Sequence, residues 1–237
     1  MRDVGTAMTT TTHPLDNPFW SALTTRQAHF ALGGALARRY APDVSPIAAL
    51  PAAGPANVAA LSDLVPVGDD AGFVGPHAPA LPDDWETLYA STIQQMIRPD
   101  PAPLPEGDVD VGRLARGDVE EMLALVELTK PGPFRSRTIE LGTYIGIRES
   151  GRLVAMAGER SCTGAFHEVS AVCTHPDAQG RGLARALIGR VVNRMLREGE
   201  TPYLHVDSRN PRAIELYLAL GFERRATFPL LHVQRVR

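Results

Sequence analysis

The chain has 237 residues, of which 44% are hydrophobic, and its formal net charge is −3. This length suits one large domain or two small ones with a buried core, and the charge gives no reason to expect nucleic acid or an anionic membrane as a partner. Only Cys162 and Cys173 are present, and no apolar stretch is long enough to cross a membrane. The sequence therefore predicts neither a disulfide framework nor a membrane partner. Since no secretory leader opens the chain, we expect a cytoplasmic protein.

The first part of the chain carries no chemical motif. Residues 1–14 are rich in threonine and are expected to form a disordered tail. Apolar spacing is compatible with an amphipathic helix over 18–40 and with a short helix over 57–64, while 85–97 suits a long strand or a helix. We therefore expect 15–105 to be an α/β accessory region, either a degenerate half-copy of the domain that follows or a plain accessory domain.

A proline-rich segment divides the sequence. Residues 98–105 contain prolines at four alternate positions, which remove backbone donors and favour an extended chain. A domain boundary is expected here, and residues 106–237 then form the second domain.

The second domain alternates strands and helices. The expected elements, in chain order, are a strand at 109–114, a helix at 118–129, a hairpin of 143–149 and 152–157 across Ser150-Gly151, a strand at 168–174, a helix at 182–197, a strand at 203–206, a helix at 211–220 and a strand at 228–236.

A glycine-rich turn follows the strand at 168–174 and reads Gln179-Gly180-Arg181-Gly182-Leu183-Ala184. Glycine has no Cβ, so the backbone approaches a ligand closely. The N–H groups and the positive dipole end of the next helix point to the same place, which is typical of an anion site.

This turn alone has competing interpretations. Arg185 stands where a dinucleotide fingerprint requires its third glycine. A Walker loop is excluded because Lys130, the single lysine, is far away in the chain. A tight turn without any ligand stays open.

A second motif lies downstream, where Asn210 to Phe222 reads Asn-x-x-Ala-x-x-x-Tyr-x-x-x-Gly-Phe. Together with the Gln-x-x-Gly-x-Ala turn that precedes it, this string resembles the GNAT superfamily of acetyl-CoA-dependent N-acyltransferases. The resemblance covers roughly residues 108–236. Residues 131–134, 157–160 and 172–176 look like a bacterial-type branch. The resemblance implies an α/β GNAT fold with a mixed central sheet flanked by helices, acetyl-CoA as cosubstrate, and an amine acceptor that the sequence does not identify.

The resemblance also assigns residues to acetyl-CoA. The backbone of the strand at 172–174 would contact the pantetheine arm, and the N–H groups of the turn would surround the pyrophosphate. Arg181 and Arg185 would meet phosphates through charge-assisted hydrogen bonds. Asn210 would bond the cofactor arm, cap the next helix, or do both. The residues assigned in this way are Val172, Cys173, Thr174, Gln179, Gly180, Arg181, Gly182, Leu183, Ala184, Arg185, Asn210 and Tyr217.

Acyl transfer to an amine requires the amine to lose a proton and the leaving thiolate to gain one. Glu168 lies eleven residues before Gln179, where some members of the superfamily carry a general-base glutamate. On a partly buried strand its pKa is expected to rise toward neutrality. Glu159 is the rival base, and a purely structural carboxylate is the alternative. Tyr217 matches the tyrosine that protonates or hydrogen-bonds the sulfur of CoA, with core packing as its alternative.

Other readings of the sequence are less favoured. Cys162, His167, Cys173 and His175 match no common zinc spacing, so we expect no metal. The arginines of the helix at 182–197 beyond Arg185 are expected on a solvated face. The favoured function is direct acetyl transfer to a primary amine, and the alternatives are a catalytically silent CoA-binding regulatory module and a structural half-domain partner. Whether two copies form a homodimer stays open.

Overall fold

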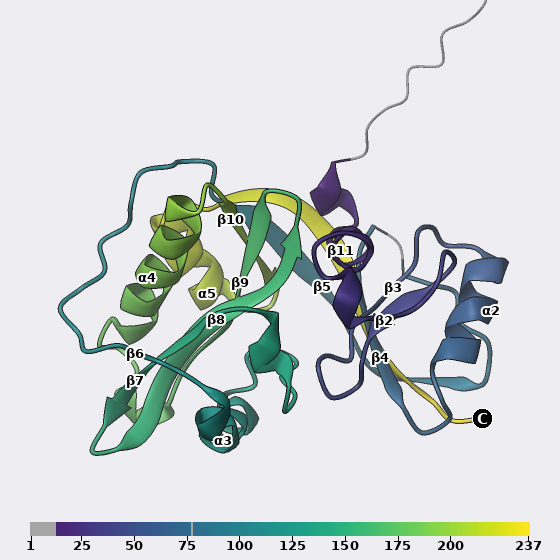
Figure 1. Cartoon of the computed structure of the whole chain (residues 1–237), viewed down its shortest axis with the longest axis horizontal. Helices are drawn as coiled ribbons and strands as arrows, with labels where there is room; N and C mark the ends of the chain where they lie inside the picture. The colour runs from purple at the N-terminus through teal and green to yellow at the C-terminus, as the bar shows by residue number, and fades with distance from the viewer. Residues whose placement is uncertain (1–12, 77) are drawn as a thin grey trace, which may run out of the picture.

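The computed structural model describes residues 13–76 and 78–237, so the tail expected at 1–14 lies almost wholly outside the described residues. A large mixed sheet forms the centre of the molecule (Figure 1). Its strands are β4 (Asp70–Val74), β5 (Trp85–Ile97), β6 (Gly112–Arg113), β7 (Tyr144–Glu149), β8 (Arg152–Thr163), β9 (Phe166–Thr174), β10 (Thr201–Asp207) and β11 (Glu223–Arg235). The spatial order is β4-β11-β5-β10-β9-β8-β7-β6. Only the β9–β10 pair is parallel, and the other neighbours are antiparallel. The expected α/β fold with a mixed sheet is confirmed.

Helices cover both faces of this sheet (Figure 1). On one face lie α4 (Leu183–Arg197) and α5 (Pro211–Ala219), and on the other lies α3 (Val119–Thr129). In α4, Leu187, Val191 and Met195 recur every four residues and are buried, because that spacing places them on one side of a helix. The helices predicted at 118–129, 182–197 and 211–220 are therefore confirmed within one or two residues.

The region before the sheet is more irregular than its apolar spacing predicts. It contains α1 (Pro18–Thr24), a small sheet of β1 (Ala31–Gly33), β2 (Arg38–Tyr40) and β3 (Ala48–Ala49), and α2 (Pro55–Leu64). The long helix expected over 18–40 is wrong, since α1 ends at Thr24. Gly33 has φ +100°, and a Cβ there would collide with the carbonyl of Ala37, so the chain turns back as a hairpin instead. The short helix expected at 57–64 is confirmed as part of α2.

The central sheet continues across the boundary expected at residue 105. β5 lies between β10 and β11, and β4 pairs with β11. The proline segment runs along α4: Leu104 N–H donates to Asn193 Oδ1 (2.7 Å), and Asn193 Nδ2 donates to the Leu104 carbonyl (2.8 Å). The accessory region thus contributes two strands to the same sheet as the second domain.

Local turn chemistry explains the hairpin of β7 and β8. Ser150 and Gly151 both have positive φ, of 50° and 84°, as a primed two-residue turn requires. The first strand of the second domain is much shorter than expected, because only Gly112 and Arg113 pair with β7.

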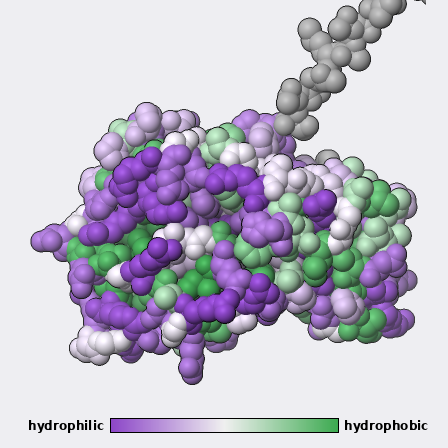
Figure 2. Space-filling view, viewed as in Figure 1, coloured by the Kyte–Doolittle hydropathy of each residue, from purple (hydrophilic) through white to green (hydrophobic). Residues whose placement is uncertain are grey.

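Figure 2 shows hydrophilic and hydrophobic residues interspersed over the viewed face. None of the helices in the described residues has the length and apolarity needed to span a bilayer.

Candidate active site

The site begins where two parallel strands separate. β9 and β10 pair only through Phe166 to Glu168, so the later residues of both strands diverge and leave a gap between them. In the same part of β9, Ala171 has φ +51°. Between the pairs Gly158–Ser170 and Met156–Cys173, two residues of β9 lie opposite a single residue of β8. This β-bulge re-aims the backbone of β9 toward the gap.

The turn before α4 supplies a row of free backbone donors. None of the N–H groups from Gly180 to Arg185 donates a hydrogen bond to another described residue. Gly180 and Gly182 have φ +78° and +79°, a conformation that glycine adopts without strain. Unbonded donors at the positive end of a fifteen-residue helix form an anion site.

The gap and the turn open into one cleft of about 960 Å³. Of the residues assigned to acetyl-CoA, all except Arg181 line it. The guanidinium of Arg181 instead pairs with Glu149 (2.6 Å), so only its backbone N–H belongs to the row of donors. Three other cationic side chains line the cleft without a carboxylate partner among the described residues: Lys130, Arg185 and Arg212.

Two polar side chains face the gap from α5. Asn210 caps this helix, because its Oδ1 accepts from the N–H of Ala213 (3.1 Å). Tyr217 packs edge-on against Phe222, and its hydroxyl bonds to none of the described residues. Burial raises the pKa of Tyr217 to about 12, so the phenol stays protonated and able to donate.

Glu168 lies beneath the cleft rather than on its surface. Its side chain is fully buried, and Arg160 donates to both of its oxygens, Nε to Oε2 (3.0 Å) and Nη2 to Oε1 (2.6 Å). His205 Nδ1 lies 2.8 Å from Oε1. Burial raises the pKa of Glu168, but Arg160 and His205 lower it more, to about 2. The expected rise in the pKa of Glu168 is therefore wrong, because the sequence does not show that these partners lie beside it.

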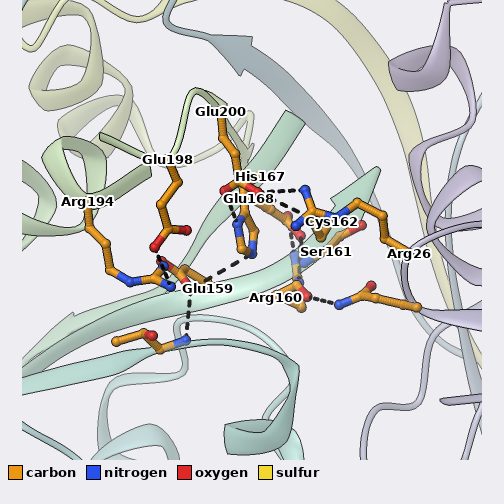
Figure 3. Close-up of polar contacts among 12 residues, drawn as sticks. Arg26, Glu159, Arg160, Ser161, Cys162, His167, Glu168, Arg194, Glu198 and Glu200 are labelled. Atoms are coloured by element: carbon orange, nitrogen blue, oxygen red, sulfur yellow. Dashed lines mark hydrogen bonds and ion pairs between the residues drawn. The ribbon is translucent and has the colours of Figure 1, made fainter. Parts of the chain in front are cut away.

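Glu159 is also held by partners. It is 1% exposed, its Oε2 accepts from the N–H of Thr143 (2.8 Å), and its Oε1 pairs with Arg194 (Figure 3). Arg194 was expected on a solvated face with Arg190 and Arg197, yet it reaches this buried carboxylate. Neither Glu159 nor Glu168 lines the cleft.

A group with metal-ligating side chains lies beside these carboxylates (Figure 3). Cys162, His167 and Glu200 place ligand atoms within 4.8 Å of one another. Glu200 already accepts from Arg26 (2.6 Å) and contacts His167 Nδ1 (2.7 Å). Cys173 and His175 are not part of this group.

The cleft extends past the gap into a second part, here called the far arm. Its walls come from residues that sequence analysis did not assign to any site. They are the apolar Pro46, Ile47, Val74, Ile93 and Leu230, with Gly72, Tyr89 and His232 from the same segments. They carry no motif. The strand residues reach the cleft because β4, β5 and β11 share the sheet with β10, and Pro46 and Ile47 reach it because they pair with Gly72 of β4.

Comparisons with known proteins support this fold and indicate a family. The family model described as FR47-like protein matches residues 144–229. Over 201 residues the chain is 31% identical to the uncharacterized protein ML0378 of Mycobacterium leprae (strain TN), covering 77% of this chain and 54% of that protein. Over 127 residues it is 32% identical to N-alpha-acetyltransferase RimI of Mycobacterium tuberculosis, covering 49% of this chain and 79% of that protein. The chain thus spans about half the length of ML0378.

A solved structure matches nearly the whole chain. An acetyltransferase from the GNAT family of Novosphingobium aromaticivorans DSM 12444 is 37% identical, with a TM-score of 0.86. The match covers 94% of this chain and 99% of that one.

Proposed function

Because the chain belongs to the GNAT family of acetyltransferases, we propose that it transfers an acetyl group from acetyl-CoA to a primary amine by direct attack. One observation carries the proposal. The unbonded N–H groups from Gly180 to Arg185 and the unbonded hydroxyl of Tyr217 open into the same cleft. An anion site and a proton donor are what binding of CoA and release of its thiolate require.

In this proposal, acetyl-CoA lies along the cleft. The N–H groups of the turn bind the pyrophosphate, and Arg185, Arg212 and Lys130 supply positive charge for the phosphates. The pantetheine arm lies in the gap between β9 and β10, where the backbone from Val172 to Thr174 is not paired with β10. The Oγ1 of Thr174 is buried without a partner, which marks a polar position for the arm to occupy.

The chemical step is a displacement at the thioester. The amine lone pair forms a C–N bond to the carbonyl carbon, the C–S bond breaks, and the amine loses one proton. Tyr217 donates its phenolic proton, or a hydrogen bond, to the departing sulfur. With a pKa of about 12 it carries that proton at every physiological pH.

Two carboxylates remain as candidates for the base that accepts the proton of the amine. Glu168 has the expected position, but a carboxylate with a pKa of about 2 is a weak base. Glu159 is buried beside Arg194. We infer that the acceptor reacts from its free-amine form, and that the proton it loses on attack passes to solvent water or, through water, to one of these carboxylates.

The experiment is release of CoA thiol from acetyl-CoA in the presence of an amine panel. We expect turnover that falls roughly 10²-fold in Tyr217→Phe, while affinity for acetyl-CoA stays within a few-fold. Tyr144→Phe is the matched control, since the Tyr144 hydroxyl is buried without a partner and does not line the cleft.

Two results would count against this proposal. Full turnover in Tyr217→Phe would make that tyrosine a packing residue. Binding of acetyl-CoA without turnover of any amine would favour the silent regulatory module.

A further inference from the structure

The far arm of the cleft indicates what kind of amine the protein accepts. We propose, on the basis of the acetyl transfer proposed above, that the acceptor is a hydrophobic α-amino acid. Its carboxylate binds Arg160, and its apolar side chain lies in the far arm.

The guanidinium of Arg160 is the donor that meets the substrate. Nε and Nη2 are both bonded to Glu168, whereas Nη1 donates to none of the described residues. The side chain is 10% exposed and lines the cleft. The Arg160 guanidinium carbon lies 5.5 Å from the ring centre of Phe19, and Gln27 Nε2 donates to the Arg160 carbonyl (2.7 Å). Arg160 is thus held in place, lines the cleft, and keeps its Nη1 amino group without a partner among the described residues.

The carboxylates around this donor are already occupied by partners within the protein. Glu168 is fully buried and fully bonded, so it does not face the substrate. Asp207 does line the cleft, but its oxygens already accept from Tyr89 (2.6 Å), from Ser91 (3.1 Å) and from Arg209. A substrate carboxylate therefore meets a preorganised donor and little repulsion.

The walls of the far arm favour an apolar side chain. Ile47, Val74 and Ile93 are each at least nine-tenths buried in the protein and line the cleft. Burying a Leu- or Phe-sized side chain against such a wall removes apolar surface from water and therefore favours binding. The cleft holds about 960 Å³ for both substrates together, which is the scale of small-molecule sites. A free amino acid fits this space beside acetyl-CoA.

The experiment compares ligands that differ in one group. L-phenylalanine, L-phenylalaninamide, phenethylamine, L-alanine and the dipeptide Phe-Ala are assayed with the full chain and acetyl-CoA, and kcat/KM is calculated on the free-amine concentration. We expect phenylalanine to exceed the amide and phenethylamine by about 10- to 100-fold, because a hydrogen bond to a charged group is lost. Alanine should also be poorer, since its side chain is too short for the far arm.

Arg160→Lys tests the residue. Lysine keeps a positive charge for Glu168. It lacks the planar guanidinium, whose fixed donors can reach Glu168 and a substrate carboxylate at the same time. The preference for phenylalanine over phenethylamine should fall at least tenfold. If the single variant does not fold, the double variant Arg160→Met/Glu168→Gln removes the buried pair as a unit and should show the same loss of preference.

Three results would overturn the inference. They are equal kcat/KM for phenylalanine and phenethylamine, an undiminished preference in Arg160→Lys, and a dipeptide better than the free amino acid, which would indicate a polypeptide N-terminus as acceptor. If no amine is acetylated, titration calorimetry of phenylalanine into the protein with CoA separates the two proposals. Binding that depends on the carboxylate and on Arg160 would sustain the acceptor site while acetyl transfer fails, and absence of binding would reject both.

Discussion

The buried pair of Arg160 and Glu168 shows how one residue's chemistry depends on its neighbours. A glutamate on a half-buried strand is expected to have a raised pKa. Here the arginine eight positions earlier, across the β8–β9 pair, reverses the direction of that shift. Breaking such a pair by removing one partner costs about 3–5 kcal/mol, because an uncompensated charge stays buried. The pair is therefore a structural unit, and its arginine also lines the cleft.

This pair sets the expected pH dependence of the reaction. With a pKa of about 2, Glu168 stays ionised at every pH above about 3 and contributes no titration near neutrality. For a series of amines of different basicity, kcat/KM should rise with pH as each amine loses its proton. The inflection of each pH profile should therefore lie at the pKa of the amine that is used. The measurement is a set of pH–rate profiles with the unmodified protein.

One inflection common to all amines would contradict that expectation. It would indicate a titrating group of the enzyme that acts as the base. Loss of the inflection in Glu159→Gln would identify Glu159, and loss in Glu168→Gln would identify Glu168.

At the scale of elements, α4 and the turn before it form the proposed binding site for acetyl-CoA. Gly182 stands at the N-terminal end of α4 and Gly199 just beyond its C-terminal end, with φ of +79° and +73°. A Cβ at either glycine would meet no atom within 4 Å. The two positions thus share the same backbone conformation but lie at opposite poles of the helix dipole.

A pair of valine variants separates strain from binding. Both Gly182→Val and Gly199→Val force a β-branched residue into a left-handed conformation, at a cost of about 1–3 kcal/mol. Only Gly182→Val also places a side chain against the row of N–H donors, so it should weaken acetyl-CoA binding about tenfold or more. Calorimetric affinity and thermal unfolding of both variants measure the two effects.

Equal affinity for acetyl-CoA in the two folded variants would remove the turn from the site. Weaker binding in Gly199→Val as well would attribute the effect to helix stability instead.

At the scale of the whole molecule, the sheet joins the two regions that the sequence separates. β11 pairs only with β4 and β5, both from the region before residue 105. β10 also pairs with β5 over five positions. The edges of a sheet left without their partners expose unpaired backbone groups and promote aggregation.

We therefore expect the isolated fragment 106–237 to lack cooperative unfolding and acetyl-CoA binding. Co-expression with fragment 1–105 should restore both, because the strands of the two fragments pair with each other. Circular dichroism on heating and calorimetric titration are the measurements. A fragment 106–237 that unfolds cooperatively and binds acetyl-CoA like the full chain would make it an independent domain.

Local chemistry accounts for what the sequence determined. Helix α4 follows from apolar residues every four positions, and the hairpin turn follows from Ser150-Gly151. The fold class and the family followed from two motifs, the Gln179–Ala184 turn and the Asn210–Phe222 string. Each of these signals lies within a short stretch of chain, where spacing and backbone preference are enough to reveal it.

The tertiary structure decided what depends on distant residues. Pairing of β5 with β10 and β11 brings Val74, Ile93 and Leu230 to the cleft, and no pattern in the chain marks them. The pKa of Glu168 likewise depends on Arg160 and His205, whose positions follow from strand register. Sheet order and electrostatic environment arise from long-range packing. The motifs were therefore enough to propose a site for the cosubstrate, while only the folded chain brought together the residues of the proposed acceptor site.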